Sequence, residues 1–79
     1  MPAESFLRDW ITEHVKPIPY ASIDQVSKDI EPLCVADAAK QGITKRELEQ
    51  AAGGNLRRRI KAAYEDAQEA EVKRNAPSN

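Results

Sequence analysis

The clearest structural signal in the chain is the segment FLRDWITEHV at residues 6–15. Its apolar residues recur at intervals of three and four, which places them in one stripe along a helix with the charged residues on the other side. The stripe consists of Phe6, Leu7, Trp10, Ile11, His14 and Val15. Pro17 and Pro19 follow, and neither can donate a backbone hydrogen bond, so the predicted helix covers residues 3–15.

A second helix is predicted over residues 22–41. Ser22 and Gln25 have the spacing of a capping box, in which two side chains satisfy free N–H groups at a helix start. Apolar residues then recur at helical spacing at Ile23, Val26, Ile30, Leu33 and Cys34. Gly42 is predicted to end this helix in the left-handed conformation, with Ile43 folding back onto the last turn.

Pro32 interrupts the pattern of the second helix. Proline has no N–H and clashes with the preceding turn, so it disturbs a helix interior but is well tolerated in a first turn. Either the helix kinks near Pro32, or a new helix begins there. Both alternatives predict helix on each side of this residue.

The second half of the chain contains a second capping-box pattern and a pair of glycines. Thr44 and Glu47 predict a helix over residues 44–52, which Gly53-Gly54-Asn55 follows. Two glycines inside a helix cost about 2 kcal/mol relative to alanine, and asparagine is a good N-cap. These facts favour a break and a further helix over residues 55–72. The alternative is one unbroken helix, because the apolar residues keep helical phase through the glycines.

Together these segments predict an all-α fold, a compact bundle of three to four short helices. Residues 1–72 are predicted to form a single domain and residues 73–79 a disordered tail. The predicted core draws on Phe6, Trp10, Ile11, Val26, Ile30, Leu33, Leu48, Leu56 and Ile60. This apolar content is small for the number of residues to be ordered, so we expect marginal stability, which pairing as a homodimer would relieve.

Composition excludes several classes of protein. The net charge of −1 and the absence of a strongly basic half argue against a dedicated nucleic-acid binder. The single cysteine cannot form an internal disulfide. The N-terminal segment lacks the apolar core of a signal peptide, and no apolar stretch is long enough to span a membrane. The expected location is therefore the cytoplasm, with no membrane partner.

Two stretches resemble a known family. Residues 6–15 resemble the opening FL-x-x-W-I helix, and residues 36–48 resemble the ADA-x-x-x-GI-[ST]-x-x-E-[IL] segment, of small uncharacterised alphaproteobacterial, mostly rhizobial, all-helical proteins. The chain departs from that pattern around Gly53-Gly54-Asn55 and the arginine run after it. The family has no known function, so the resemblance implies a folded, intracellular bacterial domain and assigns no activity.

No pattern in the chain indicates catalysis. Cys34 and His14 are a nucleophile and a base by type, but Cys34 lies on an apolar stripe, which favours an inert core thiol. His14 continues the face of Trp10 and is expected to cover the edge of the core. The sequence contains no glycine-rich phosphate-binding loop, no zinc-protease motif and no nucleophile elbow. We therefore expect a non-enzyme without metal or cofactor.

The leading hypothesis is a small protein–protein interaction or regulatory module. Its predicted partner face is the edge formed by Trp10, Ile11, His14 and Val15, and its partner is either another protein or a second copy of the chain. This hypothesis follows from the small number of large apolar residues and from the lack of any group of residues that indicates catalysis.

The alternative hypothesis is weak binding of nucleic acid or another anion by a basic cluster. Asn55, Arg57, Arg58, Arg59 and Lys61 would lie at a helix N-terminus, where free N–H groups attract anions. The competing interpretation is a solvated charged face. A DNA-binding helix-turn-helix over residues 44–62 is disfavoured, because it would bury the charged residues Glu49 and Arg59. Nucleic acid is thus an unlikely partner.

Overall fold

The computed structural model describes residues 2–75, with the side chains of residues 2–73. Four helices make up the described part, within the predicted range of three to four: α1 (Pro2–His14), α2 (Tyr20–Lys40), α3 (Lys45–Ala51) and α4 (Leu56–Asn75). The all-α bundle is therefore confirmed. None of these helices combines the length and the hydropathy that a membrane span requires.

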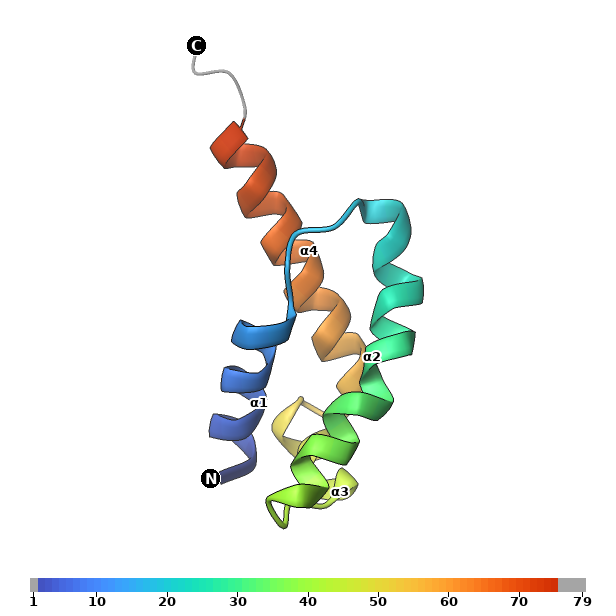
Figure 1. The fold of residues 1–79 in the computed structure, drawn as a ribbon, viewed down its shortest axis with the longest axis vertical. Coiled ribbons are helices and arrows are strands. Elements are labelled where there is room, and N and C mark those ends of the chain that lie inside the picture. The colour runs from blue at the N-terminus through green and yellow to red at the C-terminus, as the bar shows by residue number, and fades with distance from the viewer. Residues whose placement is uncertain (1, 76–79) are drawn as a thin grey trace.

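The four helices form an elongated bundle with extents of 48 × 23 × 19 Å. Helix α4 packs mainly along α2, while α1 packs mainly against α3, which closes the lower end (Figure 1). The segment after α1 crosses in front of α4 to reach the start of α2 (Figure 1). The upper half of α4 extends past the top of α1, and none of its described residues after Tyr64 is buried.

Helix α2 differs from its prediction at the start. It begins at Tyr20 with Pro19 as N-cap, and no side chain caps it, so the predicted capping box at Ser22 is wrong. The N–H of Ser22 instead donates to the carbonyl of Pro19 at 2.9 Å, inside the first turn. A proline at the N-cap suits this position, because its missing N–H is not needed there.

Helix α2 also continues through Pro32, so no new helix begins at that residue. The proline ring is exposed to solvent. Water can therefore reach the carbonyl whose partner N–H the proline lacks, which explains why the helix persists at this point.

Two glycines end helices as the sequence predicts. Gly42 and Gly53 adopt φ angles of 78° and 82°, a left-handed conformation that strains other residues. The following amides close the helix ends: Ile43 N–H donates to the carbonyl of Ala38 at 2.9 Å, and Gly54 N–H to that of Glu49 at 2.8 Å. The break after α3 is therefore confirmed.

The far end of α4 lies beyond the predicted boundary. The helix ends at Asn75, so residues 73–75 belong to it and not to the predicted tail. The rest of the predicted tail, residues 76–79, lies outside the described residues. The i,i+4 pair of Lys73 and Glu69, at 3.1 Å, favours helix at this end of the chain.

The core contains most of the predicted residues. Trp10, Leu48, Leu56 and Ile60 are buried, and Phe6, Ile11, Val26 and Ile30 pack against them half-buried. Leu33 was predicted in the core but is 57% exposed. Its neighbours on α2 explain this result, because Ser27, Cys34 and Ala38 occupy the centre of the buried face and Leu33 lies about 100° around the helix from Cys34.

Candidate functional site

The predicted partner face lies mostly inside the bundle. Trp10 is only 4% exposed, and Ile11 and Val15 are half-buried against the core. Only His14 of these residues is exposed. The edge therefore does not form an open apolar surface, although two of its residues line a groove.

Trp10 and His14 lie side by side along that groove. The two rings stack with centroids 4.2 Å apart and an interplanar angle of 14°. The Nδ1 of His14 lies 2.9 Å from the carbonyl oxygen of Trp10, and a carbonyl only accepts, so Nδ1 carries the hydrogen. The indole N–H of Trp10 donates to Asp37 Oδ2 at 2.8 Å and so ties α1 to α2.

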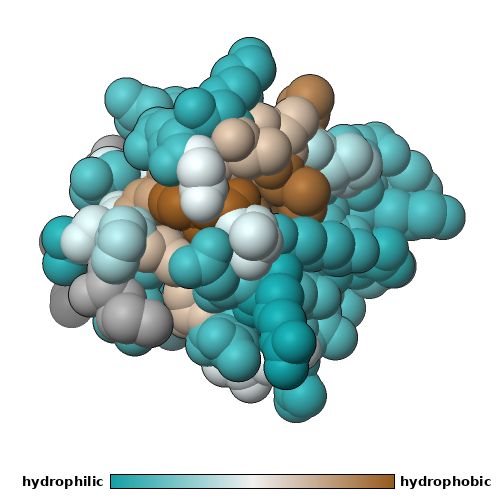
Figure 2. Space-filling model, turned by 90° about the horizontal axis from the view of Figure 1, so that it is seen from below, coloured by the Kyte–Doolittle hydropathy of each residue, from teal (hydrophilic) through white to brown (hydrophobic). Residues whose placement is uncertain are grey.

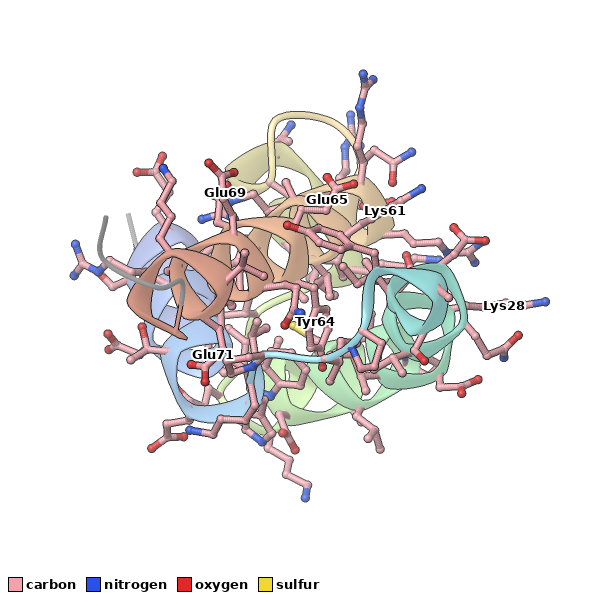
Figure 3. All side chains as sticks on the ribbon, turned by 90° about the horizontal axis from the view of Figure 1, so that it is seen from above. Lys28, Lys61, Tyr64, Glu65, Glu69 and Glu71 are labelled. Carbon is pink, nitrogen blue, oxygen red and sulfur yellow. The ribbon has the colours of Figure 1, made fainter. Side chains whose placement is uncertain are left out.

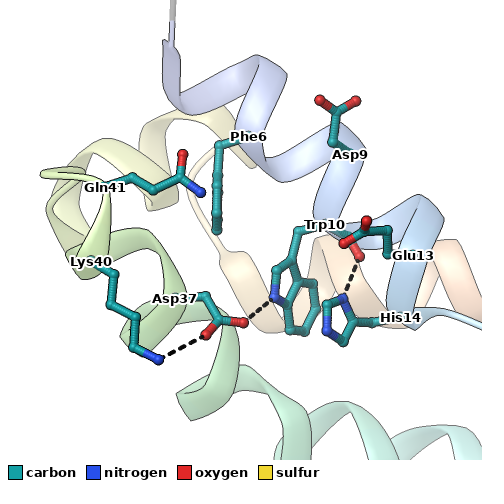
Figure 4. Close-up of a pocket in the computed structure, with 8 residues that line it drawn as sticks. All are labelled: Phe6, Asp9, Trp10, Glu13, His14, Asp37, Lys40 and Gln41. Carbon is teal, nitrogen blue, oxygen red and sulfur yellow. Dashed lines mark hydrogen bonds and ion pairs between the residues drawn. The ribbon is translucent and has the colours of Figure 1, made fainter.

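The α1–α2 groove is a hollow of about 300 Å³ between α1 and the C-terminal end of α2. Figure 4 shows the ring of Phe6 on one side, and Asp37 between the indole of Trp10 and the ammonium group of Lys40. The complete lining is Phe6, Asp9, Trp10, Glu13, His14, Asp37, Lys40 and Gln41. Aromatic residues and three acidic residues therefore line one hollow, a grouping that the sequence analysis did not predict.

Two of the four cationic residues in the predicted basic cluster pair with carboxylates of α2. Arg57 donates from Nε and Nη2 to Glu31 Oε1, at 3.2 and 3.1 Å. The ammonium group of Lys61 lies 3.4 Å from Asp24. Figure 3 shows Lys61 and Glu65 on the outer side of α4, and Lys28 pointing away from the bundle. Arg58 is exposed and Arg59 is half-buried.

The N-terminus of α4 is likewise occupied by groups of the chain itself. Asn55 caps the helix as predicted, since its Oδ1 accepts from Arg58 N–H at 3.0 Å. A carboxylate oxygen of Glu49 accepts from the N–H of Leu56. An external anion would have to displace this carboxylate, so the geometry does not favour an anion site here.

A second candidate surface lies on the outer side of α2. We define the α2 outer face as Pro32, Leu33, Val35, Ala36 and Ala39, all of which are exposed or half-buried. A shallow groove of about 340 Å³ runs along it, with Glu31 and Lys45 at its margins. The lower end of the molecule, where α2 ends and α3 begins, shows apolar surface bordered by hydrophilic residues (Figure 2).

This surface was not predicted from the sequence, because the helical periodicity placed Leu33 in the core. The signal that could have found it is the run from Pro32 to Ala36, which has no charged or polar residue. Five consecutive apolar residues cover more than one side of a helix, so some of them must face outward.

Cys34 lies on the opposite side of α2. It is fully buried, and burial together with the nearby charges of Asp37 and Glu31 raises its pKa from 9.0 to about 11. A thiol with this pKa is a poor nucleophile at neutral pH. Among the described residues, no hydrogen bond joins it to His14, and no group of three or more His, Cys, Asp or Glu side chains is placed to hold a metal ion.

Comparisons of the chain with protein-family models, curated proteins and solved structures give no match. The resemblance to the alphaproteobacterial family stays a prediction.

Proposed function

We propose that the chain is a small, non-catalytic interaction module that pairs with a second copy of itself through the α2 outer face. The observation that carries this proposal is the exposure of five neighbouring apolar residues on one side of α2, with Leu33 exposed to 57%. Apolar patches of this kind on small proteins commonly mark interaction sites.

The shape of the surface favours a helix as its occupant. Ala36 and Ala39 have short side chains, so the axis of a second helix can approach closely along this line. Leu33 and Val35 flank them and would interdigitate with the side chains of the incoming helix.

The charges at the margins favour a second copy in particular. Two residues of opposite charge, Glu31 and Lys45, border the groove. In an antiparallel pair related by a two-fold axis, Lys45 of each copy would meet Glu31 of the other, a carboxylate that already accepts two hydrogen bonds from Arg57 of its own copy. Pairing would also stabilise the fold, because the chain has few large apolar residues and the pair would bury more of them.

The pairing should be weak. Five residues of this size form a patch well below the roughly 800 Å² that each partner buries in a standard interface. We therefore expect a dissociation constant on the order of 100 µM.

Sedimentation equilibrium between about 10 µM and about 1 mM tests this proposal across the expected dissociation constant. The unchanged chain should gain average mass with concentration, and Ala36→Glu should remain a monomer, because it places a charge at the centre of the face. Ala21→Glu is the matched control, since Ala21 is also exposed on α2 but lies outside the face. A chain that stays monomeric throughout, or two variants that behave alike, would refute the proposal.

A further inference from the structure

We propose that the α1–α2 groove binds an arginine side chain of a partner polypeptide. This inference does not depend on self-pairing, because the groove and the α2 outer face share no residue. It is argued from the charge, the ring surfaces and the size of the groove.

The groove carries an excess of negative charge. Asp9, Glu13 and Asp37 line it, and Lys40 is the only lysine or arginine among the lining residues. Lys40 lies 3.9 Å from Asp37 and is 79% exposed, so this ion pair is screened by solvent. Arg8 and Asp9 form a similarly exposed pair at 3.9 Å. These contacts leave the groove attractive to a further cation.

Two carboxylates have unused capacity for hydrogen bonds. Asp37 accepts the indole N–H at Oδ2, while its Oδ1 is too far from Lys40 for a hydrogen bond. Glu13 makes no hydrogen bond or ion pair with any described residue. The bond from Trp10 holds Asp37 in place before a ligand arrives, which lowers the entropic cost of binding.

The ring surfaces favour arginine over lysine. Trp10 is buried, and the rings that a ligand can reach belong to Phe6, which is half-buried, and His14, which is exposed. A guanidinium group is planar and weakly hydrated, so it can stack on a ring while its N–H groups bond a carboxylate. An ammonium group offers no planar face for such stacking.

The volume suits one side chain. At about 300 Å³ the groove is at the lower limit of ligand pockets and is too small for a dinucleotide cofactor. Its open side lets the backbone of the partner remain outside. The expected occupant is therefore a single arginine in an exposed, basic segment.

The indole N–H signal of Trp10 provides a direct measurement, because the chain has one tryptophan. We expect N-acetyl-arginine amide to shift this NMR signal saturably at low salt, with a dissociation constant on the order of a few millimolar. N-acetyl-citrulline amide has nearly the same shape without the charge and should leave the signal in place. N-acetyl-lysine amide should bind at least about threefold more weakly than the arginine probe.

Two matched variants test whether the arginine probe binds in the groove. Glu13→Gln should weaken binding of the arginine probe about threefold or more. Glu65→Gln removes the same charge from an exposed position on α4 and should leave binding unchanged. The proposal is overturned by an unshifted Trp10 signal, by an equal response to citrulline or lysine, or by equal losses in the two variants.

Discussion

The indole N–H of Trp10 donates a 2.8 Å hydrogen bond to Asp37, a residue 27 positions later in the chain. The bond joins α1 to the C-terminal part of α2 beside the groove that lies between them. We expect it to contribute about 1 kcal/mol, since Asp37 remains partly exposed. A double-mutant cycle of Trp10→Phe and Asp37→Ala, measured by circular dichroism in urea, should give a coupling free energy of this size. Strictly additive effects would show that the bond does not stabilise the fold.

Ser27 is buried at 0% exposure, and its hydroxyl has no hydrogen-bond partner. Ser27→Ala should therefore raise the free energy of unfolding by about 1 kcal/mol, because an unpaired polar group leaves the core. Ser22→Ala is the control, since Ser22 lies on the same helix, is half-buried and caps nothing. Both variants remove one hydroxyl from α2, but only Ser27 is fully buried, so urea unfolding should show the larger gain for Ser27→Ala. Equal gains would contradict the prediction.

Cys34 should make stability depend on alkaline pH. Burial raises the pKa of its thiol from 9.0 to about 11, so the folded chain holds this proton more tightly than the unfolded chain. The resulting stabilisation is complete below pH 9 and is lost as the pH rises to about 11. Burial also raises the pKa of Tyr64, which adds a loss of the same sign.

The thiol's share of that loss can be measured with Cys34→Ala. Its free energy of unfolding should fall less between pH 8 and pH 11 than that of the unchanged chain, by at most about 3 kcal/mol. The cavity left by the substitution cancels, because only the change with pH is compared. An identical fall in both proteins would mean that the thiol titrates normally.

Gly53 tests the turn between α3 and α4. Its φ of 82° is unfavourable for a residue with a side chain, although an added Cβ would meet no atom within 4 Å. Gly53→Ala should therefore cost about 1 kcal/mol from backbone strain alone. Gly53→Asn should cost less, because asparagine tolerates this conformation. Thermal unfolding that ranks alanine at or above asparagine would contradict the strain argument.

The local features of the fold were predictable because their causes lie within a few residues. Thr44 and Glu47 form the predicted capping box, with Glu47 N–H donating to the Thr44 hydroxyl at 3.1 Å. Gly42, Gly53 and Asn55 likewise act on the turn in which they occur. Ser22 has the same pattern as Thr44, but Pro19 started α2 one turn earlier and left Ser22 no free end to cap.

The candidate surfaces were less predictable because they depend on packing between helices. Periodicity placed Leu33 and Trp10 on apolar stripes, but it does not say which part of a stripe is covered. Asp37 accepts a hydrogen bond from the indole of Trp10. Cys34 and Ala38 lie on the buried side of α2, so Leu33 is exposed to solvent. The pairing of Arg57 with Glu31, across 26 positions, is also a property of the assembled bundle.

The second half of α4, which extends past the top of α1, should be less stable than the first half. Leu56, Ile60 and Tyr64 anchor its first half in the core, whereas the described residues after Tyr64 are exposed or half-buried. A helical segment of this length is marginal in water without such anchoring. Amide hydrogens in residues 68–73 should therefore exchange with deuterium long before those near Ile60, which open only with global unfolding. Residues 68–73 would then unwind and re-form while the rest of the bundle stays intact.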